Sequence, residues 1–181
     1  ERVQFADLGT LVPTPICLDD RYVRVFYGGR DTSGVSRISF FDVDAKTLKV
    51  ESFSEWPVIE PGFTGLFDSH GVLPARILGS KFFYVGFRKG HDWKFEAYTG
   101  VLEHTGLENF KRVSSVPLFD RAHDAVYINA LHDIWQTGDT YEALIVKGMG
   151  WQPIEGRMYP RYETFLSTLT SELVEKSTIK L

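Results

Sequence analysis

Residues 71–87, GVLPARILGSKFFYVGF, decide how the chain folds. Two apolar runs flank a short polar segment, which is typical of two antiparallel strands joined by a turn. Residues 12–29, VPTPICLDDRYVRVFYGG, repeat the order: an apolar run containing proline, a polar gap and an aromatic run. Pro15 corresponds to Pro74, so the pattern returns after about 60 residues.

The rest of each copy follows the same plan. Further strands are expected at 36–44 and 48–53 in the first copy, at 93–103 and 109–113 in the second, and at 125–134, 140–148, 161–170 and 175–181 in a looser third copy. No segment keeps the 3.6-residue period of a long helix. Three repeats of four antiparallel strands predict an all-β chain built of β-propeller blades.

We expect a single domain or fragment, with blades at roughly 11–57, 68–117 and 125–181. Three blades are too few for a closed propeller, which has about four to eight. Either two chains form a homodimer that closes a six-bladed ring, or the missing blades belong to a longer parent chain. A β-sandwich of many short strands is the alternative fold, although a sandwich does not require this repeat.

Composition narrows the functional class. The 181 residues have a formal net charge of −4 and are 43% hydrophobic, as expected for a folded domain with a real core. Without a basic block or a long apolar run, neither nucleic acid nor a membrane is expected as partner. The chain begins at Glu1 without a signal peptide, and its one cysteine, Cys17, excludes an internal disulfide, so we expect a cytoplasmic location. Cys17 lies in an apolar strand and is expected to be buried.

Six segments carry a resemblance to a known superfamily: PTPICLDDRYVRVFYGGRD, SRISFFDVD, GLFDSHGVLPARI, FFYVGF, FKRVSSVPLFDR and RYETFLSTLT. In this order they resemble the five-bladed β-propeller glycoside hydrolases, which include families 43, 32 and 130. The likeness is closest to propeller proteins of bacterial polysaccharide gene clusters. It implies a carbohydrate ligand, bound at one mouth of a central channel that the first strand of each blade lines.

The resemblance also implies acids on different blades, and here the match is partial. Thr14 stands where the first blade would carry an aspartate. Asp68 fits the orienting aspartate of the second blade, and Asp124 stands where the third would carry a glutamate. Glycoside cleavage needs two carboxyl groups that flank one bond, so Asp68 and Asp124 are the leading catalytic pair. Thr14 favours two alternatives, a binding module without turnover or an incomplete structural fragment.

Several other residues are candidates for binding the sugar. His70 would lie beside Asp68 at the channel mouth, where it bonds a sugar hydroxyl or simply completes a turn. Arg30 and Asp31 follow an aromatic strand. Either Arg30 forms a bidentate pair with an anionic group of the substrate, or both residues belong to a solvated hairpin. Arg76 interrupts an apolar strand, so it needs an ion-pair partner or an opening.

Two more candidates lie in the third copy. Glu163 shares a strand face with Arg161, so it is either a catalytic acid or half of an ion pair. Trp151 and Tyr159 flank an expected loop at 150–159, and an aromatic ring there either stacks on a sugar or seals the blade edge. The five histidines, among them His91 and His123, show no metal-ligand spacing, and no motif predicts a cofactor, so neither a metal nor a cofactor is expected.

Overall fold

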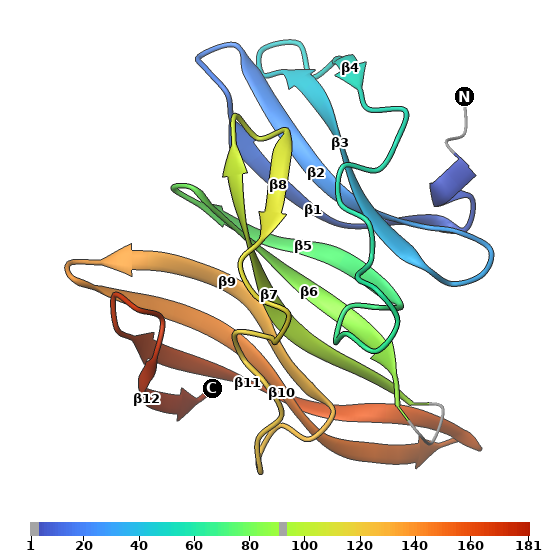
Figure 1. Ribbon diagram of the computed structural model, residues 1–181, viewed down its shortest axis with the longest axis vertical. Helices are drawn as coiled ribbons and strands as arrows, with labels where there is room; N and C mark the ends of the chain where they lie inside the picture. Colours follow the sequence, from blue (N-terminus) through green and yellow to red (C-terminus); the bar gives the residue numbers. More distant parts are fainter. Residues whose placement is uncertain (1–3, 91–93) are drawn as a thin grey trace.

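The computed structural model describes residues 4–90 and 94–181, and within them the chain is all-β (Figure 1). Twelve strands follow a short 3₁₀ turn, η1 (Gln4–Ala6). They form three groups of four, which we call units 1 to 3. The strands are β1 (Gly9–Cys17), β2 (Tyr22–Arg30), β3 (Ser36–Asp44), β4 (Val50–Phe53), β5 (Gly71–Leu78), β6 (Lys81–Lys89), β7 (Phe95–Thr105), β8 (Asn109–Arg112), β9 (Ile128–Thr137), β10 (Thr140–Ile154), β11 (Arg157–Leu169) and β12 (Glu175–Lys180). The predicted all-β class is therefore confirmed, and the strands follow one another in the expected groups of four.

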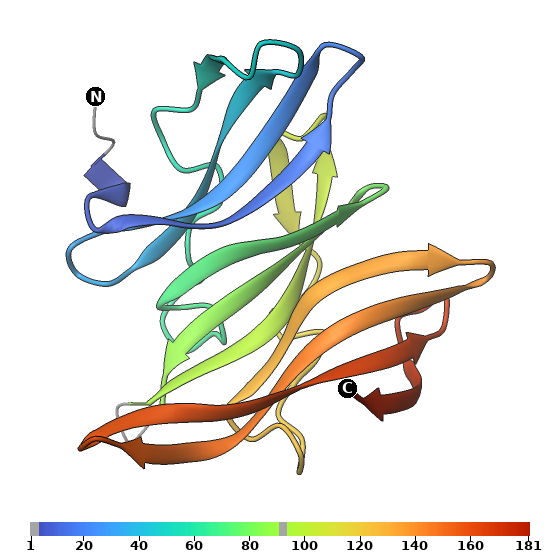
Figure 2. The ribbon, with the colours of Figure 1, turned by 180° about the vertical axis from the view of Figure 1, so that it is seen from behind.

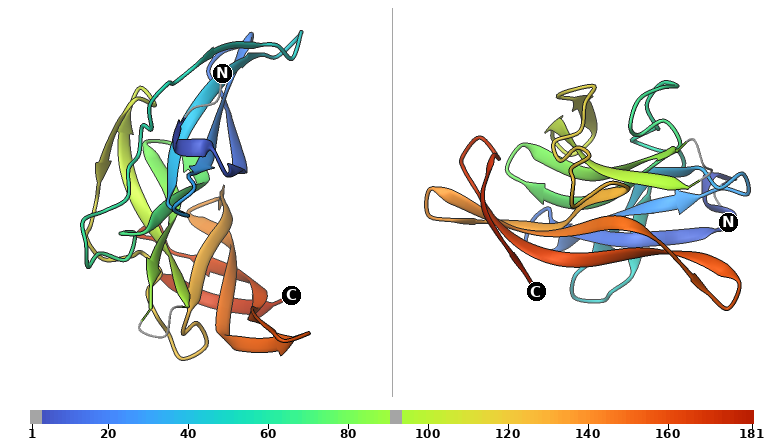
Figure 3. Two further views of the ribbon diagram at one scale, coloured as in Figure 1. Left: turned by 90° about the vertical axis from the view of Figure 1, so that its right-hand side faces the viewer. Right: turned by 90° about the horizontal axis from the view of Figure 1, so that it is seen from below.

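Within each unit the strands are antiparallel and follow the chain order. Short parallel pairings join the units into one mixed sheet: Ser36 of β3 pairs with Gly71 of β5, and Ala97 of β7 pairs with Ile128 of β9. The first strands β1, β5 and β9 lie side by side on the face shown in Figure 2, and β5 contacts both of the others. Every residue of β4 and of β12 is exposed. The left view of Figure 3 shows units 1 and 3, to which they belong, at opposite ends of the molecule.

Strand β6 lies between two hydrophobic cores. Phe82 and Tyr84 point into a core shared with unit 1, which contains Phe26, while Phe83 points into a core shared with unit 3, which contains Ile145. Successive strand residues point to opposite faces. The run FFYVGF is apolar on both faces because each face is covered by a neighbouring unit.

The expected loop at 150–159 is wrong, because this segment is a β-hairpin. Strands β10 and β11 pair as far as Ile154 and Arg157. The turn residues Glu155 and Gly156 both have positive φ, 48° and 77°, as a two-residue hairpin turn requires. Beyond Gly148, β10 no longer pairs with β9, and a strand that pairs on one side only tolerates proline.

Two smaller expectations concern Cys17 and the strand at 93–103. Cys17 is exposed rather than buried, because β1 pairs only with β2 and forms an edge of the sheet. The expected strand at 93–103 starts at Trp93, which lies outside the described residues, as does His91; β7 is described from Phe95. No helix in the described part of the chain has the length and apolar character needed to cross a membrane.

Candidate ligand-binding site

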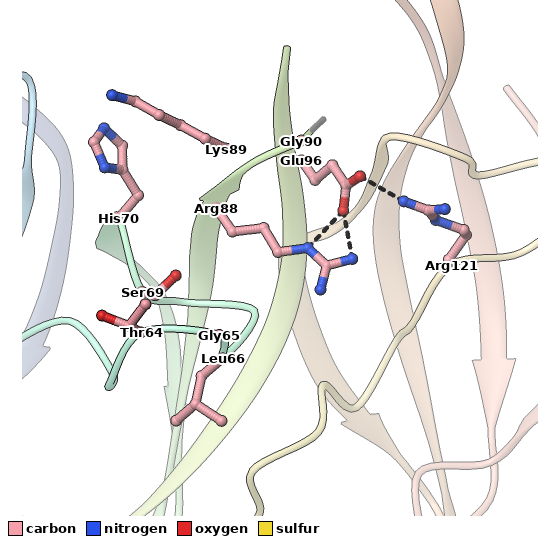
Figure 4. Close-up of a pocket in the computed structure, with 10 residues that line it drawn as sticks. All are labelled: Thr64, Gly65, Leu66, Ser69, His70, Arg88, Lys89, Gly90, Glu96 and Arg121. Atoms are coloured by element: carbon pink, nitrogen blue, oxygen red, sulfur yellow. Dashed lines mark hydrogen bonds and ion pairs between the residues drawn. The ribbon is translucent and has the colours of Figure 1, made fainter. Parts of the chain in front are cut away.

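A hollow of about 570 Å³ lies at the end of unit 2 where β6 stops and β7 begins (Figure 4). We call it the Arg88 hollow. Part of its wall is the segment that links unit 1 to β5. It is lined by Thr64, Gly65, Leu66, Ser69, His70, Arg88, Lys89, Gly90, Glu96 and Arg121. Strands, a linker and the segment before β9 thus contribute side chains to one place.

Two arginines share one buried glutamate at this hollow. The Nε and Nη2 atoms of Arg88 each lie 2.7 Å from the same oxygen of Glu96, and Nη2 of Arg121 donates to the other oxygen. The Glu96 side chain is only 7% exposed, whereas the side chains of Arg88 and Arg121 are 38% and 49% exposed. Such charge-assisted pairs fix the planes of both guanidinium groups.

Tyr98 supports this cluster of two arginines and one glutamate through hydrogen bonds. Its hydroxyl donates to the carbonyl oxygen of Val126 at 2.9 Å and accepts a hydrogen bond from Nε of Arg121 at 3.3 Å. Burial raises the pKa of Tyr98, so the hydroxyl keeps its proton. Arg121 is therefore oriented by two partners, a carboxylate and a phenol.

His70 links this hollow to a smaller one of about 310 Å³, which Arg30 also lines. The imidazole ring lies 5.4 Å from the ring of Phe95, measured between centroids. Burial and, next, the charge of Lys89 lower the pKa of His70. The imidazole is therefore neutral near pH 7, with one nitrogen that donates and one that accepts.

Of the adjacent pair Arg30 and Asp31, the arginine lines the smaller hollow. Nε of Arg30 donates to the hydroxyl of Ser36 at 3.0 Å. Asp31 instead closes its own hairpin: it accepts from the backbone N–H groups of Ser33 and Val35, and it pairs with Arg37 at 2.6 Å. These contacts match the hairpin alternative for Asp31.

Acid is expected to lower the stability of unit 1 by protonating Asp31. Burial alone would raise the pKa of Asp31, but its hydrogen bonds from Ser33 and Arg37 outweigh burial and lower the pKa to about 2. An unfolded aspartate has a pKa of about 3.9. The stabilisation by the Asp31 carboxylate is therefore complete above pH values of about 3.9 and is lost as the pH falls towards 2. We expect the urea midpoint to drop over this range, and to drop less in Asp31→Asn than in wild type. Asp139→Asn, in an exposed turn, is the control and should follow wild type.

Asp68 points away from the hollow although its neighbours Ser69 and His70 line it. Its side chain is fully buried. One carboxylate oxygen accepts from the hydroxyl of Tyr84 at 2.9 Å and from Nε and Nη2 of Arg112 at 2.9 and 2.8 Å. A Cβ atom added to Gly62 or to Gly86 would overlap Asp68, so the backbone packs tightly around the carboxylate.

The other predicted acids also have cationic partners. Asp124, 44% exposed, accepts from the ammonium of Lys147 at 3.0 Å. Glu163 pairs with Lys180 at 2.7 Å. Neither these two acids nor Asp68 belongs to the lining of the Arg88 hollow. The three carboxylates therefore take part in three separate ion pairs.

Arg76 and Trp151 also lie away from the hollow. Arg76 finds a partner in Asp133, with Nε 3.4 Å from its carboxylate. The ring of Trp151 stands edge-on to Tyr127, with 6.5 Å between centroids. No group of three metal-ligating side chains occurs among the residues that the structure describes.

The sequence singled out His70 and Arg30, which line hollows in the structure, but it did not single out Arg88, Glu96 or Arg121. Arg121 ends the segment FKRVSSVPLFDR, which contributed to the resemblance without its arginine being singled out. Arg88 directly follows the aromatic run at 82–87. A charged side chain at the end of a doubly buried strand is the signal that could have identified it, because such a charge needs a partner or an opening.

Comparison with known proteins gives a likeness of fold. No protein-family model matches the chain, and no curated protein matches it significantly. One similar solved structure is a glycoside hydrolase, with a TM-score of 0.69 and 12% sequence identity over 93% of this chain and 55% of that one. Another is a glycosyl hydrolase from Bacteroides ovatus, with a TM-score of 0.57 and 14% identity over 95% of this chain and 48% of that one. The chain therefore has a glycoside-hydrolase-like fold and spans about half the length of the two structures that it matches.

Proposed function

We propose that the chain is the ligand-binding part of a carbohydrate-active, glycoside-hydrolase-like protein, and that a saccharide binds in the Arg88 hollow. The observation that carries this proposal is the pair of arginines fixed on Glu96 beside a neutral His70. The fold, shared with two glycoside hydrolases, supports a carbohydrate as the ligand. Fold alone does not establish function, so the proposal rests on the chemistry of the hollow.

That chemistry suits a sugar. Guanidinium and imidazole N–H groups donate to hydroxyl oxygens, and the hydroxyls of Thr64 and Ser69 both donate and accept. Leu66 adds an apolar surface for the C–H face of a sugar ring. A few converging polar groups beside apolar surface are typical of small-molecule sites.

The test is saccharide binding measured by calorimetry on the wild type and on Arg121→Ala. Removing a charged hydrogen-bond donor costs about 1.5–3 kcal/mol, so we expect affinity to fall about tenfold or more. Arg157→Ala, which removes an exposed arginine from the start of β11, is the matched control and should leave affinity unchanged. Equal affinities for all three proteins would place the ligand elsewhere.

Hydrolysis is the second candidate, favoured by the two glycoside hydrolases of the same fold. It requires two carboxyl groups that flank the scissile bond. Asp68 and Asp124 remain the proposed pair, with Glu163 as a third acid, although each is held in an ion pair in this chain. Release of product from chromogenic glycosides would favour the hydrolase; binding without release would favour the module.

We further propose that units 1 to 3 are blades of a propeller. The ring is completed either by blades of a longer parent chain, as the half-length match suggests, or by a second copy of this chain. Light scattering on a sizing column separates the two. A dimer favours the six-bladed ring, a dye-binding monomer favours missing blades, and a compact monomer that binds no dye argues against the propeller.

A further inference from the structure

The lining of the Arg88 hollow has an excess of positive charge. Three of its described residues are cationic, Arg88, Lys89 and Arg121, and one is a carboxylate, Glu96. The chain as a whole has a formal net charge of −4. A positive hollow on an acidic protein is therefore a local feature and not a reflection of the average surface.

Burial separates the two signs of charge at this hollow. The carboxylate of Glu96 is almost fully covered, while a third or more of each arginine side chain is exposed. A molecule that enters the hollow therefore meets guanidinium groups before it meets the carboxylate. Arg88 uses its Nε and Nη2 on Glu96, and within the described part of the chain its Nη1 has no hydrogen-bond partner. Guanidinium groups are planar forks that suit the oxygens of an anion.

Lys89 adds a charge that Glu96 does not neutralise. It is exposed at the end of β6, and in Figure 4 its side chain extends past the imidazole of His70. Its charge contributes to the lowered pKa of His70, which places the ammonium within electrostatic reach of the ring. One side of the hollow thus presents an ammonium, and the other presents two oriented guanidinium groups.

We propose that the Arg88 hollow selects acidic saccharides, with the anionic group of the sugar bound between Lys89 and the two arginines. This inference rests on the proposed function of the same hollow and adds the chemical class of the ligand. Carboxylate and phosphate groups share the required chemistry, since each offers several negatively charged oxygens to Arg and Lys donors. A neutral sugar offers the ammonium of Lys89 no counter-charge.

The experiment compares trigalacturonate, a neutral trisaccharide and glucose 1-phosphate by calorimetry on the intact chain. At about 50 mM NaCl we expect an anionic sugar to bind at least tenfold more tightly than the neutral one. At about 500 mM NaCl the difference should shrink, because salt screens exposed charges. Lys89→Gln should weaken anionic binding about fivefold and weaken neutral binding clearly less. Lys81→Gln, at the opposite end of β6, makes the same charge change and should alter neither.

The outcomes separate this inference from the proposed function. Tighter binding of trigalacturonate assigns a carboxylate as the anionic group, and tighter binding of the phosphate sugar assigns a phosphoryl group. Equal affinities for neutral and anionic sugars would overturn the acidic specificity and leave the carbohydrate site standing. Absence of binding by every saccharide would contradict the proposed function, and the present inference with it.

Discussion

Asp68→Asn is expected to lower the free energy of unfolding by about 3 kcal/mol. The carboxylate is fully buried and its charge is matched by Arg112, whose side chain is 31% exposed. Removing one partner of a buried pair leaves the other charge uncompensated, which costs about 3–5 kcal/mol when both are fully buried. The lower end of that range applies because Arg112 retains contact with water. Urea unfolding followed by fluorescence measures the loss.

Two further variants show whether the ion pair is the cause. Glu163→Gln breaks an ion pair with Lys180 in which both side chains reach water, 32% and 58% exposed, and we expect it to cost less than about 1 kcal/mol. The double variant Asp68→Asn with Arg112→Met should lose less than the two single variants combined, because residues in contact do not act additively. A loss for Asp68→Asn as small as that of Glu163→Gln would contradict the structural role of Asp68.

Phe82→Ala should be about as damaging, with an expected loss of about 3–5 kcal/mol. The side chain is fully buried, and its ring lies edge-on to Phe26 and Phe110 at centroid distances of 5.0 and 5.3 Å. Truncation removes the contact with Phe26 of unit 1 and the contact with Phe110 within unit 2, and it leaves a cavity that rigid strands cannot close. Chemical denaturation, with the slope checked for two-state behaviour, gives the value.

The controls for Phe82 vary exposure and volume separately. Phe63 is 88% exposed, so Phe63→Ala should change stability by less than about 0.5 kcal/mol. Phe82→Leu keeps most of the volume and should cost clearly less than Phe82→Ala. Similar losses for Phe82→Ala and Phe63→Ala would show that the packing between the first two units contributes little.

Much of the strand plan was predictable because it is local. Alternation, turn residues and the return of Pro15 as Pro74 were enough to predict all three groups of four strands. The error at 150–159 arose because Pro153 and Pro160 hid a hairpin. Proline argues against a strand only where both sides need hydrogen bonds, and β10 there has one partner.

The site was less predictable because its contacts are not local. Arg121 reaches Glu96 across 25 positions, and no spacing rule predicts such a partner. The sequence places Asp68 just before β5 but could not say which way its side chain points. Its direction depends on Tyr84 and Arg112, which join it only after unit 2 has folded.

The position of β6 between two cores has a consequence for cooperativity. A strand with water on one face can remain folded when one neighbour is lost, whereas β6 needs units 1 and 3 at once. Excising unit 2 would expose two apolar faces of a small sheet, and so small a piece rarely folds alone. The middle third of the chain is therefore not an autonomous foldon, and it should unfold together with its neighbours. An insertion at either junction is expected to lower the stability of both cores.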